Sequence, residues 1–288
     1  MKTIKIGGVP EHFNLPWHLA IENGKFSKKG IDLQWQDFLG GTGAMCKALR
    51  DGSIDAAIVL TEGIIKDIIA GNPSKIVKVY VASPLLWGIH VDANSKFQKV
   101  EELENAKVAI SRRGSGSQLM AIVNAHQHNF DKNKLNYEIV KNLDGGIEAL
   151  TKGTADYFMW EHFTTKPYVD NGIFRRIDSI TTPWPCFVLA VRDEVLNEDK
   201  KLIKKLISVI NKQLKSFNRP FKTGELLRIF TERYQQQPED VKEWLSITKW
   251  DRKKYVSEKL INNIQNKLVT FSVIEESVQA KMLSKKIN

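Results

Sequence analysis

The chain has 288 residues, of which 42% are hydrophobic and 26% are charged. These proportions are ordinary for a globular protein of one large or two medium domains, and they exclude a disordered or fibrous chain. No apolar run approaches the roughly 18 residues of a membrane span. We therefore expect no membrane insertion.

The formal net charge is +10, and lysines dominate it. They are spread over the predicted helices after Asn197 without interleaved aromatic residues. This favours a solvated lysine-rich surface, with attraction of a small anion as a lesser alternative, and we expect no nucleic-acid partner. Cys46 and Cys186 lack metal-ligand spacing and are expected to be reduced thiols. The chain enters a strand directly after Met1, which predicts a cytoplasmic protein; a periplasmic or lipid-anchored location would require that a leader was removed.

Strands and helices alternate in the first part of the chain. Apolar runs bounded by glycine or proline predict strands at 4–6, 31–35, 54–60 and 76–82. The segment 11–18 enters a helix that runs to Asn23 and ends at Gly24. A second helix is opened by Thr42 as its N-cap and ends at a tight turn at Gly52, and a third ends near Gly71.

The alternation continues and then gives way to helices. Strands are predicted at 87–91, 107–111, 137–141, 157–160 and 173–177, with short helices at 100–105 and 165–171 and a longer one after 112–117. The segment 187–191 is predicted as a strand that returns to the first lobe. Helices follow at about 198–217, 222–236, 239–246, 252–268 and 273–285.

One motif occurs twice in the same context. Leu49-x-x-Gly52-x-x-Asp55 is echoed 101 residues later by Leu150-x-x-Gly153-x-x-Asp156, each time between a helix and an apolar strand. The repeat predicts two similar α/β lobes. Lobe 1 is expected to comprise residues 1–84 and 188–288, and lobe 2 residues 88–183. Hinge crossings near 83–90 and 183–190 would let the lobes close around a ligand.

Candidate ligand-binding residues follow the carboxyl ends of the predicted strands, where ligands bind in open parallel sheets. The loops 40–43 and 114–117 each offer free N–H groups for an anion, Arg112 is favoured over Arg113, and aromatic residues offer apolar walls. The candidates are Glu11, His12, Phe13, Asn14, Trp17, Gly41, Thr42, Gly43, Thr61, Glu62, Arg112, Ser115, Gly116, Ser117, Trp160, Glu161, His162 and Trp184.

Several of these residues have an equally simple structural explanation. Trp17 and Trp160 suit a core as well as a pocket. Glu62 and Glu161, which we assign to equivalent positions after the two repeat strands, could receive a cationic group or be helix N-terminal acids favoured by the dipole. Lone histidines are more often structural. His126 and His128 point about 200° apart on a helix and cannot chelate a metal together. No catalytic motif is present, and no catalytic residue, metal or cofactor is assigned.

A series of sequence segments, spread over nearly the whole chain and in the same order, resembles a known family. They are Pro16 with Ala20-x-x-x-Gly24-x-Phe26, Gly30-Ile31-Asp32-Leu33, Gly40-Gly41, the Leu49 motif, Val100-x-x-Leu103-x-x-Ala106-Lys107-Val108-Ala109, and the C-terminal Trp244-Leu245 and Trp250. The chain resembles the type II periplasmic binding proteins of the nitrate, taurine and alkanesulfonate group, which includes thiamine-precursor binders. The resemblance implies a two-lobed α/β fold with two mostly parallel sheets flanked by helices and joined by a two-strand hinge.

The resemblance also implies a function. It predicts a solute-binding protein that closes on a small polar or anionic organic ligand, with an ABC-transporter permease as a partner if the protein is exported. The repeated-cysteine signature of the related fungal pyrimidine synthase is absent. The alternatives are a cytosolic enzyme on the same fold, such as a lyase or a thiamine-pyrimidine-synthesis-like enzyme in which Glu161 and His162 do acid–base work, and a cytosolic ligand sensor.

Overall fold

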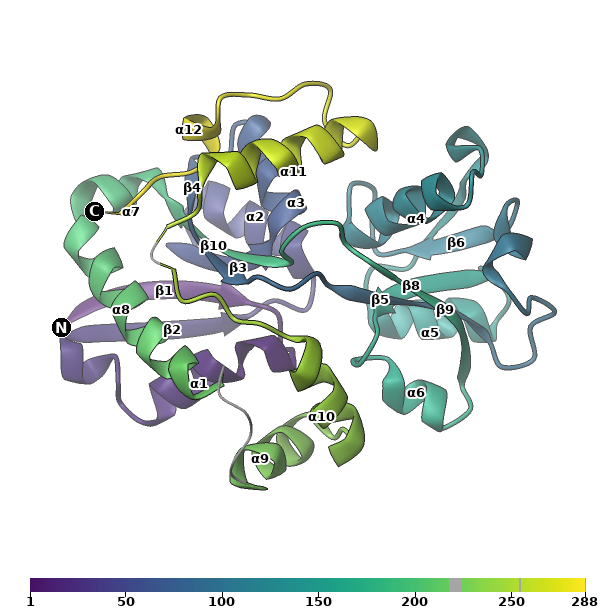
Figure 1. Cartoon of the computed structure of the whole chain (residues 1–288), viewed down its shortest axis with the longest axis horizontal. Helices are drawn as coiled ribbons and strands as arrows, with labels where there is room; N and C mark the ends of the chain where they lie inside the picture. Colours follow the sequence, from purple (N-terminus) through teal and green to yellow (C-terminus); the bar gives the residue numbers. More distant parts are fainter. Residues whose placement is uncertain (218–223, 254, 288) are drawn as a thin grey trace. The chain divides into compact units, whose positions relative to one another are not determined.

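The computed structural model describes residues 1–217, 224–253 and 255–287, and the chain forms two compact units (Figure 1). The first unit is Met1–Ser83 with Trp184–Asn288, and the second is Pro84–Pro183. No helix of the described part is long and apolar enough to cross a bilayer.

The first unit contains a five-stranded mixed sheet in the order β2-β1-β3-β10-β4. Parallel pairing joins β1 to β2 and β3, whereas β10 runs antiparallel between β3 and β4. The β3 residues and residues 187–191 of β10 are apolar and almost wholly buried, as expected for strands with a neighbour on each side and covered faces. The bounds are β1 (Lys2–Gly8), β2 (Ile31–Asp37), β3 (Ala56–Leu60), β4 (Ser74–Val81) and β10 (Phe187–Arg192).

Helices surround this sheet. The predicted helix ending at Asn23 is confirmed: α1 has Asn23 as its C-cap, and Gly24 follows with a φ of +61°. The helical elements of the unit are η1 (His12–Asn14), α1 (Leu15–Glu22), η2 (Ser27–Lys29), α2 (Gly41–Asp51), α3 (Thr61–Ile69), α7 (Asp193–Glu198), α8 (Lys200–Phe217), α9 (Gly224–Tyr234), α10 (Pro238–Ile247), α11 (Glu258–Thr270) and α12 (Ala280–Leu283).

The second unit has a five-stranded mixed sheet in the order β7-β6-β8-β5-β9. Here β5 is the antiparallel strand, between β8 and β9. Phe158 and Phe174 pack with smaller apolar residues into a core on this sheet. The elements are β5 (Leu86–Asp92), η3 (Val100–Leu103), β6 (Lys107–Ile110), α4 (Gly116–Gln127), η4 (Lys132–Lys134), β7 (Asn136–Ile139), α5 (Leu143–Thr151), β8 (Tyr157–Glu161), α6 (Lys166–Asp170) and β9 (Phe174–Thr181).

The sequence repeat is a structural repeat. Gly52 and Gly153 have φ angles of +76° and +67°, a left-handed conformation that glycine adopts without a Cβ penalty. Asp55 Oδ2 accepts the Lys5 backbone N–H over 2.8 Å, and Asp156 Oδ2 accepts the Lys107 N–H over 2.7 Å. Each aspartate thus ties its helix–turn–strand motif to the unit's first parallel strand.

The predicted fold class is confirmed, with one refinement of the sheets. Four strands of each sheet run in one direction, and the fifth is the antiparallel β10 or β5. Each sheet is therefore mixed.

Some predicted helix boundaries are wrong. Thr42 is not the N-cap of α2: Gly40 holds that position without a side-chain bond. The predicted helices 252–268 and 273–285 begin only at Glu258 and Ala280. Within the predicted helix 273–285, Ser284 is extended and forms a bridge to Ile76 of β4, because a pairing backbone cannot also be helical. Residues 222–223 of the predicted helix 222–236, and residue 254 of 252–268, lie outside the described residues.

Candidate functional site

The first-unit candidates gather at the carboxyl end of its parallel strands. His12–Asn14 follows β1, Gly41–Gly43 follows β2, and Thr61 and Glu62 follow β3. Phe187 at the start of β10 pairs with Leu60 at the end of β3. Because β10 runs antiparallel to β3, Trp184 reaches the same edge of the sheet as Glu62.

Glu62 and Trp184 form a buried pair. Trp184 Nε1 donates a hydrogen bond to Glu62 Oε2 over 2.8 Å. Glu62 Oε1 is buried and has no hydrogen-bond partner among the described residues. Burial raises the pKa of Glu62 to about 7, against the lowering by hydrogen bonds from its own backbone and from Trp184. The Glu62 carboxyl therefore titrates near neutral pH and has one oxygen open to a new partner.

Thr61 fixes the start of α3 beside Trp184. Its hydroxyl donates to the Pro185 carbonyl over 2.6 Å, and its backbone N–H donates to the Cys186 carbonyl over 3.0 Å. Thr61 is 1% exposed. Its hydroxyl is committed to these contacts, so Thr61 positions Glu62 and Trp184.

The start of α2 lies against the start of α3. A Cβ built on Gly63 would be 2.4 Å from Thr42 Cγ2. The Gly41 N–H donates to the Phe38 carbonyl over 3.0 Å, and Gly41, Thr42 and Gly43 are half-buried. The N–H groups of Thr42 and Gly43 belong to the first helical turn, which has no intrahelical acceptor. A helix start, the kind of feature that favours an anion, is thus close to Glu62.

The residues after β1 pack into the core of the first unit. His12 packs with ring centroids 4.8 Å from Phe13 and 4.1 Å from Trp244, and burial lowers its pKa to about 3. The Phe13 carbonyl accepts from Tyr80 Oη over 2.8 Å and from Trp250 Nε1 over 3.1 Å. These contacts hold the segment in the core of the unit.

Other members of this group have similar surroundings. Trp17 is fully buried and stacks on Phe26, so it is a core residue. Asn14 is buried and donates to the Val9 carbonyl over 2.8 Å. Glu11 is half-buried at the N-cap of η1.

In the second unit, the serine hydroxyls of the loop before α4 form hydrogen bonds within that loop. Ser115 is the N-cap and accepts the Gln118 N–H over 3.2 Å. Ser117 Oγ accepts the Ser111 N–H over 2.9 Å and lies 3.0 Å from Ser115 Oγ. The hydroxyls stabilise the loop, while Gly116 begins the helix. Arg113 stacks over Tyr137 at 4.6 Å, and Arg112 is half-buried.

Glu161 and His162 have different hydrogen-bond partners in the structure. Glu161 Oε2 accepts from Thr164 N and Thr164 Oγ1 over 2.6 and 2.8 Å. His162 Nε2 accepts from Arg176 over 2.6 Å, so its Nδ1 carries the proton and donates to Ser179 over 2.9 Å. Burial and Arg176 lower the pKa of His162 to about 4. The His162 ring is a neutral structural group at pH 7.

The predicted equivalence of Glu62 and Glu161 is wrong. Glu62 follows Asp55 by seven residues, and Glu161 follows Asp156 by five. Glu161 ends its strand, while Glu62 lies in the first turn of α3. The two carboxyls nevertheless share one property, because burial also raises the pKa of Glu161 to about 7.

Trp160 lies partly exposed on its strand and stacks on Phe158, with ring centroids 5.3 Å apart.

In the described part of the chain, no group of three or more His, Cys, Asp or Glu side chains is placed to hold a metal ion. The Glu62–Trp184 bond is the site feature that sequence patterns could not reveal, because 122 residues separate its partners.

Comparison with known proteins agrees with this architecture. The model of the Ca3427-like PBP family matches residues 87–180, within the second unit. The Candida albicans CA3427 gene product, whose structure exhibits the generic periplasmic binding protein fold, is 27% identical, with a TM-score of 0.90 over 100% of this chain and 97% of that one. No curated protein matches the sequence.

Two more distant structures share the fold. The alkanesulfonate-binding protein SsuA from Xanthomonas axonopodis pv. citri, bound to MOPS, is 14% identical, with a TM-score of 0.78 over 99% of this chain and 95% of that one. The nitrate-binding protein NrtA from Synechocystis PCC 6803 is 16% identical, with a TM-score of 0.73 over 98% and 84%. The chain therefore has the periplasmic-binding-protein fold, and residues 87–180 resemble the Ca3427-like PBP family.

Proposed function

We propose that the protein is a non-catalytic binding protein for a small polar organic solute that carries an anionic group. The observation that carries this proposal is Glu62, a buried carboxyl with one oxygen unpartnered among the described residues, at the carboxyl end of the first-unit sheet. Leaving a buried polar atom without a partner costs about 1–3 kcal/mol. A donor group on a ligand would remove that cost.

The surroundings of Glu62 define the rest of the ligand. Trp184 holds the other carboxyl oxygen in place and supplies aromatic surface. The neighbouring α2 start offers the N–H groups of Thr42 and Gly43, and a helix N-terminus favours a negative charge. A ligand that carries both a hydrogen-bond donor and an anionic group fits this combination.

Relatives support the class of ligand. SsuA and NrtA are described as alkanesulfonate- and nitrate-binding proteins, and both ligands are anions. By analogy with such periplasmic proteins, an ABC-transporter permease is a partner to be tested. A cytoplasmic location stays a prediction, as does the role of Arg112 and the loop before α4.

Native mass spectrometry of the purified protein tests this function by detecting a co-purified small molecule. The affinity of the identified ligand is then measured calorimetrically for Glu62→Gln and Thr42→Ala, with Glu232→Gln as a surface control on α9. We expect at least about tenfold weaker binding for Glu62→Gln and unchanged binding for the control. Unchanged affinity in both site variants would place the ligand elsewhere.

The predicted closure of the two units stays a separate prediction. Small-angle scattering with and without saturating ligand tests it, and an unchanged radius of gyration would contradict it. The enzyme alternative has its own test, turnover of the bound ligand that is lost in His162→Ala. The bonded ring nitrogens of His162 give that alternative no structural support.

A further inference from the structure

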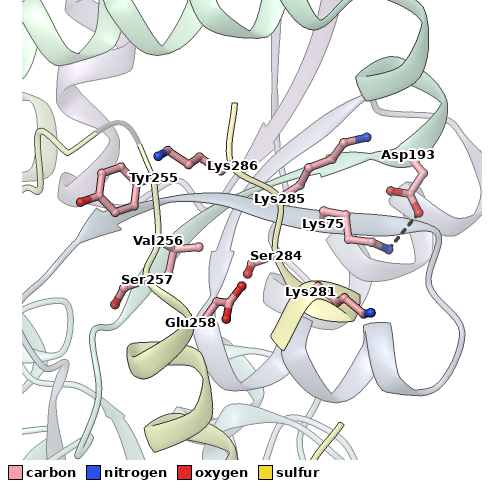
Figure 2. Close-up of a pocket in the computed structure, with 10 residues that line it drawn as sticks. All are labelled: Lys75, Asp193, Tyr255, Val256, Ser257, Glu258, Lys281, Ser284, Lys285 and Lys286. Carbon is pink, nitrogen blue, oxygen red and sulfur yellow. Dashed lines mark hydrogen bonds and ion pairs between the residues drawn. The ribbon is translucent and has the colours of Figure 1, made fainter. Parts of the chain in front are cut away.

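Two adjoining pockets lie on the first unit beside the edge strand β4 and α8. The first encloses about 590 Å³, and its cationic lining residues are Lys75, Lys281, Lys285 and Lys286 (Figure 2). The second encloses about 530 Å³ and is lined by the cations Lys204, Arg252, Lys253 and Lys286. Both pockets include Tyr255 and Lys286. We call them together the basic double pocket.

Positive charge is concentrated in this pocket. Its described lining contains seven different cations and two carboxylates, Asp193 and Glu258, a balance of +5 against the chain's +10. Asp193 pairs with Lys75 over 3.0 Å, so its charge is compensated locally. The described lining of the second pocket includes no acidic residue. Lysines that are dispersed in the sequence thus meet at one place.

Hydrogen bonds from two side chains of the first unit anchor the backbone that carries Arg252 and Lys253. Lys78 is 1% exposed, and its ammonium donates to the Asp251 and Lys253 carbonyls. Asn211 donates to the Arg252 carbonyl over 2.9 Å. Three successive carbonyls are therefore bonded to the body of the unit. This anchoring makes the wall of the second pocket an ordered element.

The C-terminal segment is anchored as well. Ser284 bridges to Ile76, the Lys285 N–H donates to the Ile76 carbonyl over 3.0 Å, and Ile287 is buried. Figure 2 shows Lys285 and Lys286 leaving this segment in opposite directions. Lys286 Nζ lies 5.1 Å from the centre of the Tyr255 ring, and Lys285 donates to Asn197 over 3.1 Å. Both lysines line the first pocket, and Lys286 also lines the second.

We propose that the basic double pocket binds a small compound with two or more clustered phosphate groups. Its volume lies in the usual range of ligand pockets, and a ligand with one charge would leave most of the cations uncompensated. Lysine ammonium groups bind phosphate as point charges. Ser257 at the N-cap of the 13-residue α11 adds a helix start to the first pocket. This inference is independent of the solute proposed to bind near Glu62.

Titration calorimetry of the full chain with inorganic pyrophosphate tests the inference, at about 50 and 150 mM salt. We expect saturable binding of one equivalent. The double variant Lys285→Ala/Lys286→Ala should weaken it by about tenfold or more, whereas Lys28→Ala/Lys29→Ala, which removes two exposed lysines of the same unit, should change it little. Glu62→Gln should bind pyrophosphate normally, which separates this site from the proposed solute site.

Further measurements distinguish a lipid headgroup from a free phosphate compound, and one set of outcomes would contradict the proposal. Binding to vesicles of phosphatidylcholine with a phosphoinositide, displaced by pyrophosphate and lost in Lys285→Ala/Lys286→Ala, would assign a lipid headgroup. Pyrophosphate binding without vesicle binding would assign a free metabolite. Absence of saturable pyrophosphate binding at the lower salt concentration, or equal weakening in both lysine pairs, would overturn the proposal.

Discussion

The indole Nε1 of Trp184 donates a hydrogen bond to Oε2 of Glu62, 2.8 Å away, at the edge of the first-unit sheet. The bond holds a carboxyl group inside the protein, where burial raises the pKa of Glu62 to about 7. A carboxyl group whose pKa differs between the folded and unfolded chain makes the stability of the fold depend on pH.

We predict that Glu62 makes the folded protein less stable as pH rises. The unfolded carboxyl ionises near its ordinary pKa of 4.5, while the folded one keeps its proton up to about 7. The stabilising contribution is therefore complete below pH 4.5 and lost between 4.5 and 7, by up to about 3 kcal/mol. Urea unfolding at pH 5 and pH 7.5 gives the difference in unfolding free energy between Glu62→Gln and the native chain. This difference should favour the variant more at pH 7.5 than at pH 5. An equal difference at both pH values would contradict the buried, protonated state.

We predict the opposite pH dependence for two buried histidines. Burial lowers the pKa of His12 and, together with Arg176, that of His90, to about 3 each. Since the unfolded rings protonate near 6.5, their stabilising contribution is present above pH 6.5 and falls as pH drops toward 3, by about 2 kcal/mol per ring at pH 5. Nitrogen NMR should show both rings neutral at pH 5. A ring titration midpoint near 6.5 for either residue would show that it is not buried as described.

The repeated aspartates should contribute separately to the two units. Asp55→Ala removes the acceptor of the Lys5 N–H, and Asp156→Ala that of Lys107. Each should cost about 1–2 kcal/mol, because a backbone donor loses a charged acceptor. Hydrogen exchange read by mass spectrometry should increase around Lys5 only in Asp55→Ala and around Lys107 only in Asp156→Ala. Asp170→Ala, which removes a surface i,i+4 pair, is the control; increased exchange at both strands in either variant would refute separate roles.

The two repeat glycines should differ in their sensitivity to alanine. Both have positive φ angles, so alanine costs about 1 kcal/mol at either position. A Cβ on Gly153 meets no atom within 4 Å, whereas one on Gly52 lies 3.0 Å from Arg192 Nη1. Gly52→Ala should therefore lower the unfolding free energy more than Gly153→Ala. Gly224→Ala, at the start of α9 with open space around it, should be neutral or stabilising. The reverse order for Gly52 and Gly153 would exclude the Arg192 contact as the cause.

Much of the fold was predictable from local patterns. The apolar runs, the glycine turns and the repeated Gly52 and Gly153 motifs identified most strands and the duplicated lobe design, because strand preference and left-handed turns depend on residue type over a few positions. The extended conformation of Ser284, inside the predicted helix 273–285, was not predictable in this way. It depends on pairing with Ile76 of β4, a contact that overrides local helix preference.

The sequence by itself determined that the chain alternates strands and helices, that it contains two related lobes, and that polar loops follow the strand ends. Only the tertiary structure decided the surroundings of those residues. Trp17 lies in the core, and both ring nitrogens of His162 form hydrogen bonds. One carboxyl oxygen of Glu62 has no hydrogen-bond partner among the described residues. The tertiary structure also brings lysines from four distant segments into the basic double pocket. Burial, pairing and charge clustering depend on contacts between segments far apart in the chain, and no local pattern encodes them.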